Sequence, residues 1–357
     1  MGPQSLDDLI KRVMANAAMA AESAEREGGG TPPVASTPMD QAVPRSSKAA
    51  HIAPQQTRSP VVHRGRKAGA GPNNSDRESG QVVMPYWSAG LAGIPNELLR
   101  SSLFNVCGAH VPRANLINHL VAGYDKSVQI FYTGQELRQL PDLDVFLRLL
   151  TLAQNTKPDT WVSFRRADML RHLGWHSSKK DYSRLLDCLT RLNATSLRIH
   201  SPRIDRIADE FLPETSEDEG RGIAFSLVSA FRYENSSGKT SSEWAVKFDR
   251  ELLALFKGSH YSLLSLELRQ KLSPFGKWLH GYLSTHRQPW PFTLSMCIEK
   301  SGSRQSIEAR AARMDWANKV LLPALAQLKA EGFLLDSTYD PKSEKVSVSR
   351  APLFPTT

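Results

Sequence analysis

The feature of this sequence that most constrains its fold is an order of elements that occurs twice. Each occurrence starts with a brief helical segment that ends at a glycine, Gly174 in the first and Gly302 in the second. A turn rich in serine and basic residues follows, and a long amphipathic segment comes after it. Each occurrence ends with two extended segments joined by turn residues, which predicts a hairpin. The repeat indicates two related domains in tandem.

In the first occurrence, residues 166–173 are the brief helix and residues 182–192 lie in the long one. An apolar stripe follows the long helix at helical spacing and contains Tyr182, Leu185, Leu186, Leu189 and Leu192. Strands are expected in four segments, which are residues 128–133, 196–200, 223–233 and 243–248.

In the second occurrence, residues 295–300 are the brief helix and residues 306–329 the long one. The inward positions expected in the long helix are Ile307, Met314, Val320, Leu321, Leu325 and Leu328. Gly332 suits the C-terminal cap, and residues 333–350 form a hairpin pattern. A short helix, a tight turn, an amphipathic helix and a hairpin are the parts of a winged helix-turn-helix.

We therefore predict an α+β chain with two tandem winged-helix domains behind a disordered tail. The tail is small, polar and rich in proline, so it lacks the large apolar residues that a core needs. Leu9, Val13 and Ala17 have helical spacing and allow one short helix there. The predicted parts are the tail at residues 1–80, the first domain at 81–250 and the second at 251–357.

Positive charge is concentrated in part of this tail. Residues 41–77 carry seven Lys or Arg against one acid. Such a segment can touch phosphates without sequence preference, although a solvated linker is the plainer interpretation. The whole chain has a formal net charge of +9, which favours a polyanionic partner because positive potential attracts and concentrates it.

Cysteine usage and hydropathy exclude several classes of protein. Cys107, Cys188 and Cys297 form no C-x-x-C pair, so we expect neither a disulfide framework nor a zinc site. The apolar runs are too short to span a membrane, and the N-terminus lacks the pattern of a secretory signal. We expect a cytoplasmic protein that needs no metal or cofactor and does not contact a membrane.

The basic turn of the first occurrence stands where the long helix begins. Free amide groups and partial positive charge at a helix N-terminus favour phosphate. Taken alone, the turn favours the plainer interpretation, in which its serines cap the helix and its lysines face solvent. The candidate DNA contacts here are Ser177, Ser178, Lys179, Lys180, Ser183 and Arg184, with Lys239 in the hairpin turn.

The second occurrence changes that balance because a similar basic turn stands at the matching place. Arginine and glutamine are the residues that bind guanine and adenine edges in the major groove with paired hydrogen bonds. The candidate contacts here are Ser303, Arg304, Gln305, Arg310, Arg313 and Lys319. Two such helix starts favour double-stranded DNA, with helices in the major groove and further contacts to phosphates.

Two short patterns resemble parts of catalytic or metal-binding motifs, but neither has the spacing that such a motif needs. Gly238 to Thr240 reads GKT, but Tyr233 occupies the place of the first glycine of a phosphate-binding loop. His172 and His176 lie on either side of Gly174, so they are not expected to share a helix face. An enzyme acting on nucleic acid would need metal-binding carboxylates or a tyrosine beside a histidine triad. We find neither, and we expect no enzyme.

Several segments in a fixed order resemble the TrfA-type plasmid replication initiators, over residues 94–335. The segments are RSSLFN at residues 100–105, FYTGQELR at 131–138, DMLRHLGW at 168–175, SRLLDCLTRLNAT at 183–195, LFKGSHY at 255–261, RQKLSP at 269–274 and STHRQPWPF at 284–292. Residues 318–330 also resemble the proline-bearing recognition helix of wider groups of iteron-binding Rep proteins.

The resemblance implies an initiator that binds direct repeats, called iterons, in the double-stranded DNA of a plasmid origin. It further implies melting of an adjacent AT-rich segment, recruitment of the host helicase and polymerase sliding clamp, and self-association as a dimer. A tandem winged-helix transcriptional repressor is the alternative. Direct repeats beside an AT-rich segment of the replicon would favour the initiator, and inverted repeats at a promoter would favour the repressor.

One family feature departs from its usual form in this chain. TrfA-type proteins carry a clamp-binding peptide of the Q-x-x-L-F kind before the folded region, where this chain has QVVMPYW at residues 81–87. Gln81, Met84 and Tyr86 are the candidate clamp contacts. An ordinary strand or linker that docks on the first domain is the plainer interpretation.

Overall fold

The computed structural model describes residues 82–121, 127–203, 206, 223–234, 237–305 and 308–352, and the structural statements below concern these residues. The predicted tail and its short helix lie outside them. Buried apolar side chains form two clusters, one from Val82 to Leu266 and one from Leu272 to Val346. We call residues 82–266 the N-terminal lobe and residues 272–352 the C-terminal lobe. No helix in the described ranges is long and apolar enough to cross a membrane.

A pair of strands joins the beginning and the end of the N-terminal lobe. β1 (Leu91–Pro95) pairs antiparallel with β11 (Tyr261–Ser265). Ahead of β11 lie α7 (Arg250–Ala254) and the short turn η3 (Lys257–Ser259), and α8 (Leu266–Lys271) leads into the C-terminal lobe. The buried side chains of α7 belong to the first cluster. The first cluster ends at Leu266 and the second begins at Leu272. The domain boundary between residues 250 and 251 stays a prediction.

The N-terminal lobe contains a four-stranded antiparallel sheet with the order β3-β4-β7-β8. Ile130 and Tyr132 of one central strand and Leu197 and Ile199 of the next point into the core. The strands predicted at residues 128–133 and 196–200 are thereby confirmed. The four strands are β3 (Asn115–Val121), β4 (Gln129–Gln135), β7 (Ser196–His200) and β8 (Ile223–Phe225).

The single strand predicted over residues 223–233 is wrong. The segment forms β8 and then β9 (Ala230–Glu234), which belong to different sheets. Between them, the Asn193 side-chain amide donates to the carbonyl of Val228 at 2.8 Å and to that of Ser229 at 3.0 Å. The Val228 amide donates to Leu192 at 3.2 Å. The end of the preceding helix therefore holds this backbone and directs the chain from one sheet to the other.

The first occurrence of the repeated order forms a module in the N-terminal lobe. Its three-stranded antiparallel sheet has the order β6-β10-β9. Leu185, Leu189 and Leu192 of its long helix are buried, as the apolar stripe predicted. In chain order the elements are α3 (Asp144–Leu152), β6 (Val162–Arg165), α4 (Arg166–His172), α5 (Lys179–Asn193), β9 and β10 (Thr240–Lys247).

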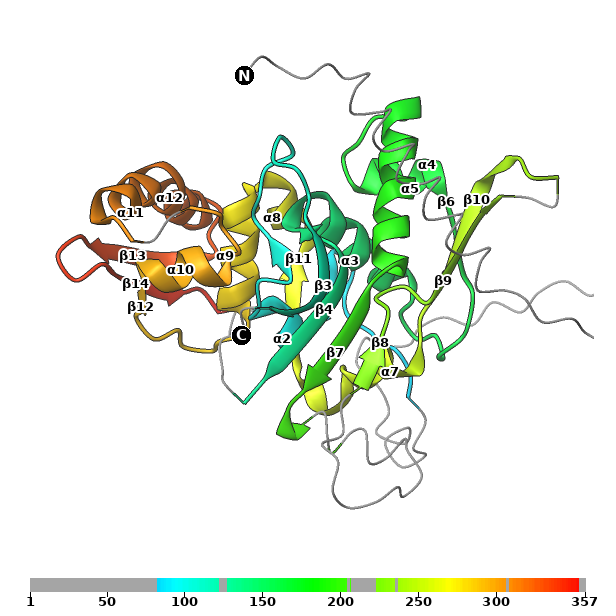
Figure 1. The fold of residues 1–357 in the computed structure, drawn as a ribbon, viewed down its shortest axis with the longest axis horizontal. Coiled ribbons are helices and arrows are strands. Elements are labelled where there is room, and N and C mark those ends of the chain that lie inside the picture. Colours follow the sequence, from blue (N-terminus) through cyan, green and yellow to red (C-terminus); the bar gives the residue numbers. More distant parts are fainter. Residues whose placement is uncertain are drawn as a thin grey trace, which may run out of the picture. The chain divides into compact units, whose positions relative to one another are not determined.

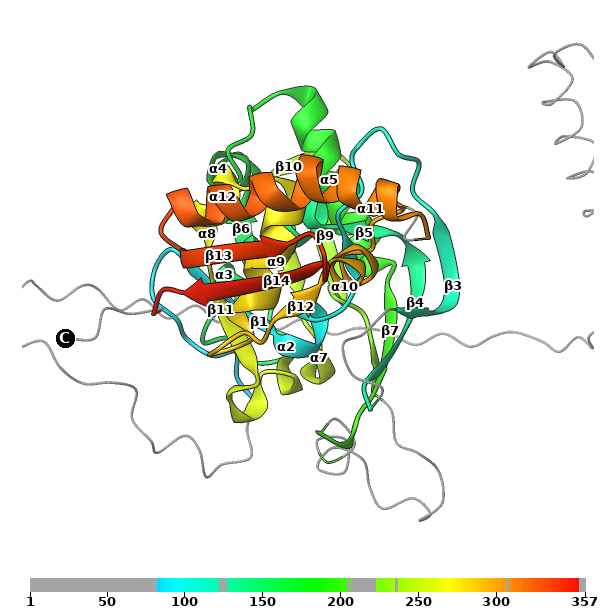
Figure 2. The same ribbon diagram turned by 90° about the vertical axis from the view of Figure 1, so that its left-hand side faces the viewer.

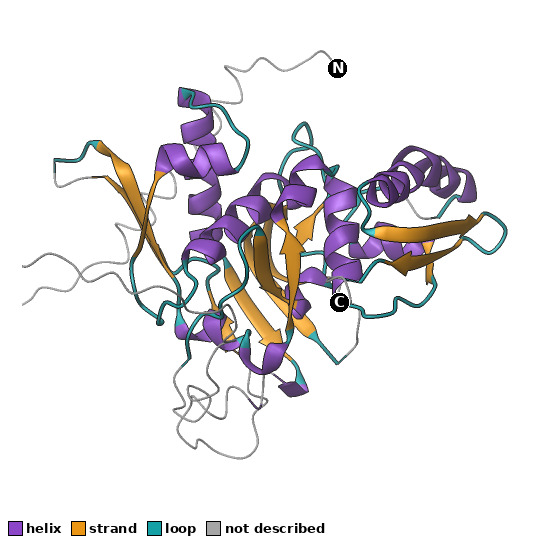
Figure 3. Ribbon diagram, turned by 180° about the vertical axis from the view of Figure 1, so that it is seen from behind, coloured by secondary structure: helices purple, strands orange, loops and turns teal. Residues whose placement is uncertain are grey.

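The second occurrence forms a module of the same order in the C-terminal lobe. Its sheet has the order β12-β14-β13. In both modules the third strand along the chain is therefore central and pairs with the first and the second. The elements are α9 (Pro274–Ser284), β12 (Phe292–Thr293), α10 (Leu294–Lys300), α11 (Arg310–Trp316), the π-helical turn η4 (Ala317–Leu321), α12 (Leu322–Ala330), β13 (Leu334–Asp340) and β14 (Lys345–Arg350). Figure 1 shows both modules, and Figure 3 shows each hairpin beside the helices of its own module.

The long helix of the C-terminal lobe runs through α11, η4 and α12 without a break and contains a proline. Pro323 has no amide hydrogen to donate, and its ring crowds the carbonyl one turn earlier. The π-helical turn η4 lies in the turn before this proline, which is where such a bulge relieves the missing hydrogen bond. Trp316, Leu321 and Leu325 on the same helix remain buried.

The segment between β2 (Phe104–Asn105) and β3 lies where the two lobes meet. We call residues 106–114 the strap. β2 pairs parallel with β5 (Leu137–Arg138), which the π-helical turn η2 (Gln139–Leu143) connects to α3. The short helix α2 (Asn96–Leu99) precedes β2 and contacts α9. The strap thus belongs to the N-terminal lobe but lies beside the C-terminal one.

Candidate nucleic-acid interface

The start of α5 presents the first basic turn to solvent. Ser178 is the N-cap, and its hydroxyl accepts a hydrogen bond from the Asp181 amide at 3.1 Å and donates to the Asp181 carboxylate at 2.7 Å. The capping role that the plainer interpretation gave to the serines is therefore present at Ser178. Lys179 and Lys180 are exposed in the first turn of the helix, beside the exposed Ser177. The two lysines are therefore accessible to an anion, in the same turn as the Asp181 carboxylate.

Arg184 lies one turn further along α5 and packs on an aromatic ring. Its guanidinium carbon is 4.0 Å from the centroid of Trp175, in the loop between α4 and α5. Arg166 makes a similar contact, 4.4 Å from the centroid of Tyr182. The two contacts hold the loop and the neighbouring helix against α5. Arg184 is therefore half-buried, whereas Ser183 on the same helix is exposed.

Lys239 is exposed in the turn that joins β9 to β10. Gly238 beside it has a φ of 68°, a conformation that glycine adopts without strain. The GKT residues therefore lie in a hairpin turn and not in a phosphate-binding loop before a helix. This places Lys239 at the tip of the hairpin, as predicted.

Two arginines at the start of α11 bind the turn of the following hairpin. The Arg313 guanidinium forms a paired contact with the Glu344 carboxylate, at 2.8 and 2.9 Å. That hydrogen bond lowers the pKa of Glu344. Arg310 donates to the carbonyl of Pro341 at 2.9 Å. Arg310 remains 63% exposed and Arg313 only 18%, so Arg310 is the more accessible of the two candidate contacts.

Four candidate residues of the C-terminal lobe line one groove of about 610 Å³. They are Ser303, Arg304, Gln305 and Lys319. The strap forms the opposite wall with residues 106–108 and with His110 and Val111. Lys319 is exposed and forms an ion pair with Asp315 at 2.8 Å. The groove is therefore built by both lobes, and it brings together candidate residues that are separated in sequence.

Arg304 of this groove also contacts the N-terminal lobe. Its guanidinium is 3.0 and 3.1 Å from the two carboxylate oxygens of Glu136, which directly follows β4. The hydrogen bond to Glu136 raises the pKa of Arg304. An interaction between residues 168 positions apart leaves no pattern in a single sequence, so it could not be predicted from the residues alone. The position of His110 in the groove, on the strap and far from Arg304 in sequence, could not be predicted for the same reason.

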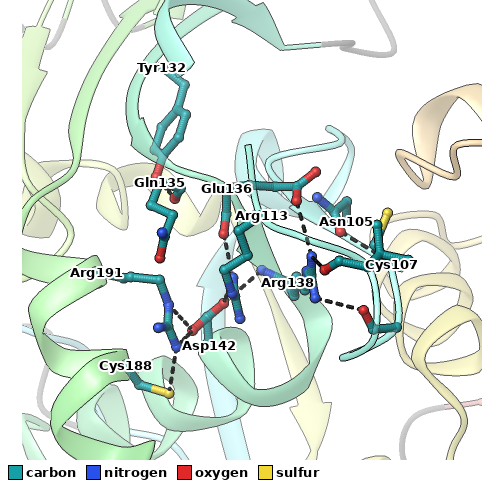
Figure 4. A network of polar contacts seen from close by, with 12 residues as sticks. Asn105, Cys107, Arg113, Tyr132, Gln135, Glu136, Arg138, Asp142, Cys188 and Arg191 are labelled. Carbon is teal, nitrogen blue, oxygen red and sulfur yellow. Dashed lines mark hydrogen bonds and ion pairs between the residues drawn. The ribbon is translucent and has the colours of Figure 1, made fainter. Parts of the chain in front are cut away.

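Glu136 and its neighbours belong to a polar network beneath the strap (Figure 4). At its centre, the fully buried carboxylate of Asp142 accepts from Arg113 at 2.7 Å and from Arg191 of α5 at 2.8 and 3.0 Å. Burial raises the pKa of the Cys188 thiol and of the Tyr132 hydroxyl near this network. The network connects the strap to the long helix of the N-terminal module.

The structure describes two of the three candidate clamp-binding residues, and only one of these two is exposed. Gln81 lies outside the described residues. Met84 is 1% exposed, and its backbone bonds to Thr156 and Asn155 at 3.0 Å each, whereas Tyr86 is 65% exposed. This arrangement matches the plainer interpretation, a segment docked on the lobe. Clamp binding through Met84 would require the segment to leave this position.

Comparison with known proteins places the chain among replication proteins. A family described as TrfA protein matches residues 79–333. The plasmid replication initiator protein TrfA of Escherichia coli is 31% identical over 208 residues, which cover 58% of this chain and 50% of that protein. The chain thus spans about half the length of this curated relative.

Two crystal structures of domains 2 and 3 of RctB are also similar. One is 16% identical with a TM-score of 0.47 and covers 71% of this chain and 97% of that one. The other is 17% identical with a TM-score of 0.44 and covers 70% and 95%. The family match alone extends from the N-terminal lobe into the C-terminal lobe and covers more than half of the sequence. The chain therefore belongs to the TrfA family.

Proposed function

We propose that this chain is a plasmid replication initiator that binds direct repeats in double-stranded origin DNA. The observation that carries the proposal is the pair of modules with the same strand order, each with a helix start that carries exposed basic residues. Both helix starts lie within the part of the chain that matches the TrfA family. The relative from Escherichia coli is named a plasmid replication initiator, and we extend that role to this chain as part of the proposal.

Each module is proposed to be a winged helix. The order helix, strand, helix, helix and hairpin, with a three-stranded antiparallel sheet, supports this assignment. α5 and the helix from α11 to α12 are then the recognition helices, and the β9-β10 and β13-β14 hairpins are the wings. In such motifs the recognition helix enters the major groove with its N-terminal residues at the base edges.

Neither helix start is buried. Figures 1 and 2 share a vertical axis, and in both views α5 and α11 lie along the upper side of the described residues. This arrangement supports a single duplex contacted by both modules. The formal net charge of +9 supplies the general attraction to phosphates.

Melting of an AT-rich segment is proposed to need no catalytic residue. Deformation of the duplex and capture of a separated strand can be driven by the binding energy of several protomers on neighbouring sites. Recruitment of the host helicase and sliding clamp completes the proposed role, as the family resemblance implies.

Self-association is also part of the proposal. β3 lies at one edge of its sheet and exposes Ile117 by 85% and Leu120 by 52%. Exposed apolar residues on an edge strand favour pairing with another chain. Ile117→Lys is expected to shift the full-length protein toward the monomer in sedimentation experiments, and an unchanged monomer–dimer equilibrium would exclude this edge as the dimer contact.

Footprinting on the DNA of the encoding replicon tests the function. The proposal predicts protection of several short direct repeats, with permanganate-reactive thymines in an adjacent AT-rich segment. Protection confined to inverted repeats at a promoter would instead identify a repressor. Absence of any protected site would overturn the proposal.

A further inference from the structure

The ion pair between Arg304 and Glu136 crosses from one lobe to the other. Arg304 lies in the turn between α10 and α11, and its side chain is 48% exposed. Glu136 is 8% exposed, and both its carboxylate oxygens face the guanidinium. A charged pair with one partner this buried is less screened by solvent than a surface pair.

Glu136 is also the point where the strap is attached. Arg138, which is 2% exposed, lies 3.3 Å from the Glu136 carboxylate and donates to the strap carbonyls of Gly108 at 2.7 Å and Val111 at 2.6 Å. Arg113 at the other end of the strap donates to the Glu136 carbonyl. Figure 4 shows Glu136 beside Arg138 and Arg113. Arg304 therefore binds the carboxylate that also contacts Arg138, the residue that holds two strap carbonyls.

The backbones of the turn and the strap are in close contact at the same place. The Val106 amide donates to the carbonyl of Ser301 at 3.1 Å. Gly302 has a φ of 65°, and a Cβ atom there would lie 2.6 Å from the Cβ of Asn105. Only glycine fits at this position, because a side chain would both strain the backbone and collide with β2.

We propose that Arg304 is a positioning residue and not a DNA contact. Its pair with Glu136 fixes the turn between α10 and α11 against the strap, and thereby places Gln305 and the start of the recognition helix. A phosphate that approached the exposed side of Arg304 would be repelled by the Glu136 carboxylate, which already neutralises the guanidinium. The inference rests on the proposed function, and it reassigns one of the residues that the sequence placed at the DNA.

A double-mutant cycle separates the two roles. We expect Glu136→Gln and Arg304→Gln each to weaken binding to the footprinted site about tenfold, and the double variant to bind no more weakly than either. The salt dependence of binding should stay unchanged in all three. Direct phosphate contact predicts instead that Arg304→Gln flattens the salt dependence by about one phosphate unit while Glu136→Gln binds as well as wild type or better. That result would overturn the inference.

The matched control is Lys271→Gln. Lys271 lies on α8, outside both modules, and pairs with Glu331 at 2.8 Å with its own side chain 47% exposed. This variant should bind the footprinted site like wild type. Thermal melting of each full-length variant shows that it is folded before binding is compared.

A second measurement needs no DNA. Hydrogen exchange of residues 106–113 and 301–305 in the full-length protein should be faster in Glu136→Gln and in Arg304→Gln than in wild type or in Lys271→Gln. Unchanged exchange in these segments would overturn the inference by itself. Lack of site-specific binding by the wild type would overturn the proposed function, and the exchange result would then decide alone whether the pair holds the turn.

Discussion

At the scale of single residues, the structure separates basic side chains that are available to a ligand from those that are engaged within the protein. Residue type and spacing selected Arg310, Arg313 and Arg304 together, because all three are arginines near one helix start. Each of them contacts the protein, but to a different extent. Their acidic partners lie far along the chain, so a single sequence does not reveal which arginine is engaged.

Arg310 and Arg313 are expected to differ when each is replaced by alanine. Arg310→Ala should weaken specific binding by about 1–3 kcal/mol, the range for loss of a base contact, with little change in melting temperature. Arg313→Ala should lower the melting temperature as well, because Glu344 loses its paired contact and the wing turn is released. Gel-shift titration with thermal melting of both variants distinguishes them. Unchanged affinity in both would refute the placement of the recognition helix.

His280 of α9 gives a prediction for pH. The ring is 1% exposed, 4.7 Å from the Phe333 centroid, and burial lowers its pKa to about 3. The unfolded chain binds a proton on this side chain below about pH 6.5, while the folded protein does not. Stability should therefore fall as the pH decreases from about 6.5, with this residue contributing up to about 1.4 kcal/mol per pH unit.

Replacement of His280 by leucine tests that contribution. The variant should show a smaller decrease in unfolding free energy between pH 6.5 and pH 4.5 than the wild type, as measured by urea denaturation. Equal slopes for the two proteins would mean that His280 is not the titrating group.

At the scale of elements, local pattern was sufficient to predict the brief helix, the long helix and the hairpin turn of each module. The stripe of α5 and the turn around Gly238 are local features, and both are present in the structure. The pattern did not predict β3, because its side chains are mostly exposed and do not alternate. Nor did it divide the segment before β9, where Asn193 from the end of α5 holds the backbone.

The start of α5 yields a prediction for binding that does not depend on sequence. Lys179→Ala combined with Lys180→Ala should weaken binding to every duplex alike and reduce the salt dependence by up to about two phosphate units. Lys157→Ala, an exposed lysine in the loop after α3, is the control. An unaltered salt dependence in the double variant would show that the two lysines face solvent in the complex.

At the scale of the whole molecule, the relation between the lobes could not be predicted from the sequence. The repeated order predicted two modules, but the contacts between them join residues far apart in the chain. Asp144 at the start of α3 faces Arg269 at 3.0 Å and also pairs with Lys277. Arg269 is 1% and Lys277 4% exposed, and burial lowers the pKa of both side chains. One carboxylate therefore pairs with two cations between the cores.

Removal of that carboxylate should destabilise the protein strongly. Asp144→Ala leaves two buried cations without their anion, and loss of one partner from a buried charge cluster costs about 3–5 kcal/mol. Lys271→Ala is the control, because its pair with Glu331 at 2.8 Å is solvent-exposed at the lysine and should contribute little. Urea denaturation of both variants measures the difference. If Asp144→Ala unfolded at the same urea concentration as Lys271→Ala, the charge cluster would not hold the lobes together, and the remaining contacts between them, including the Arg304–Glu136 pair, would have to do so.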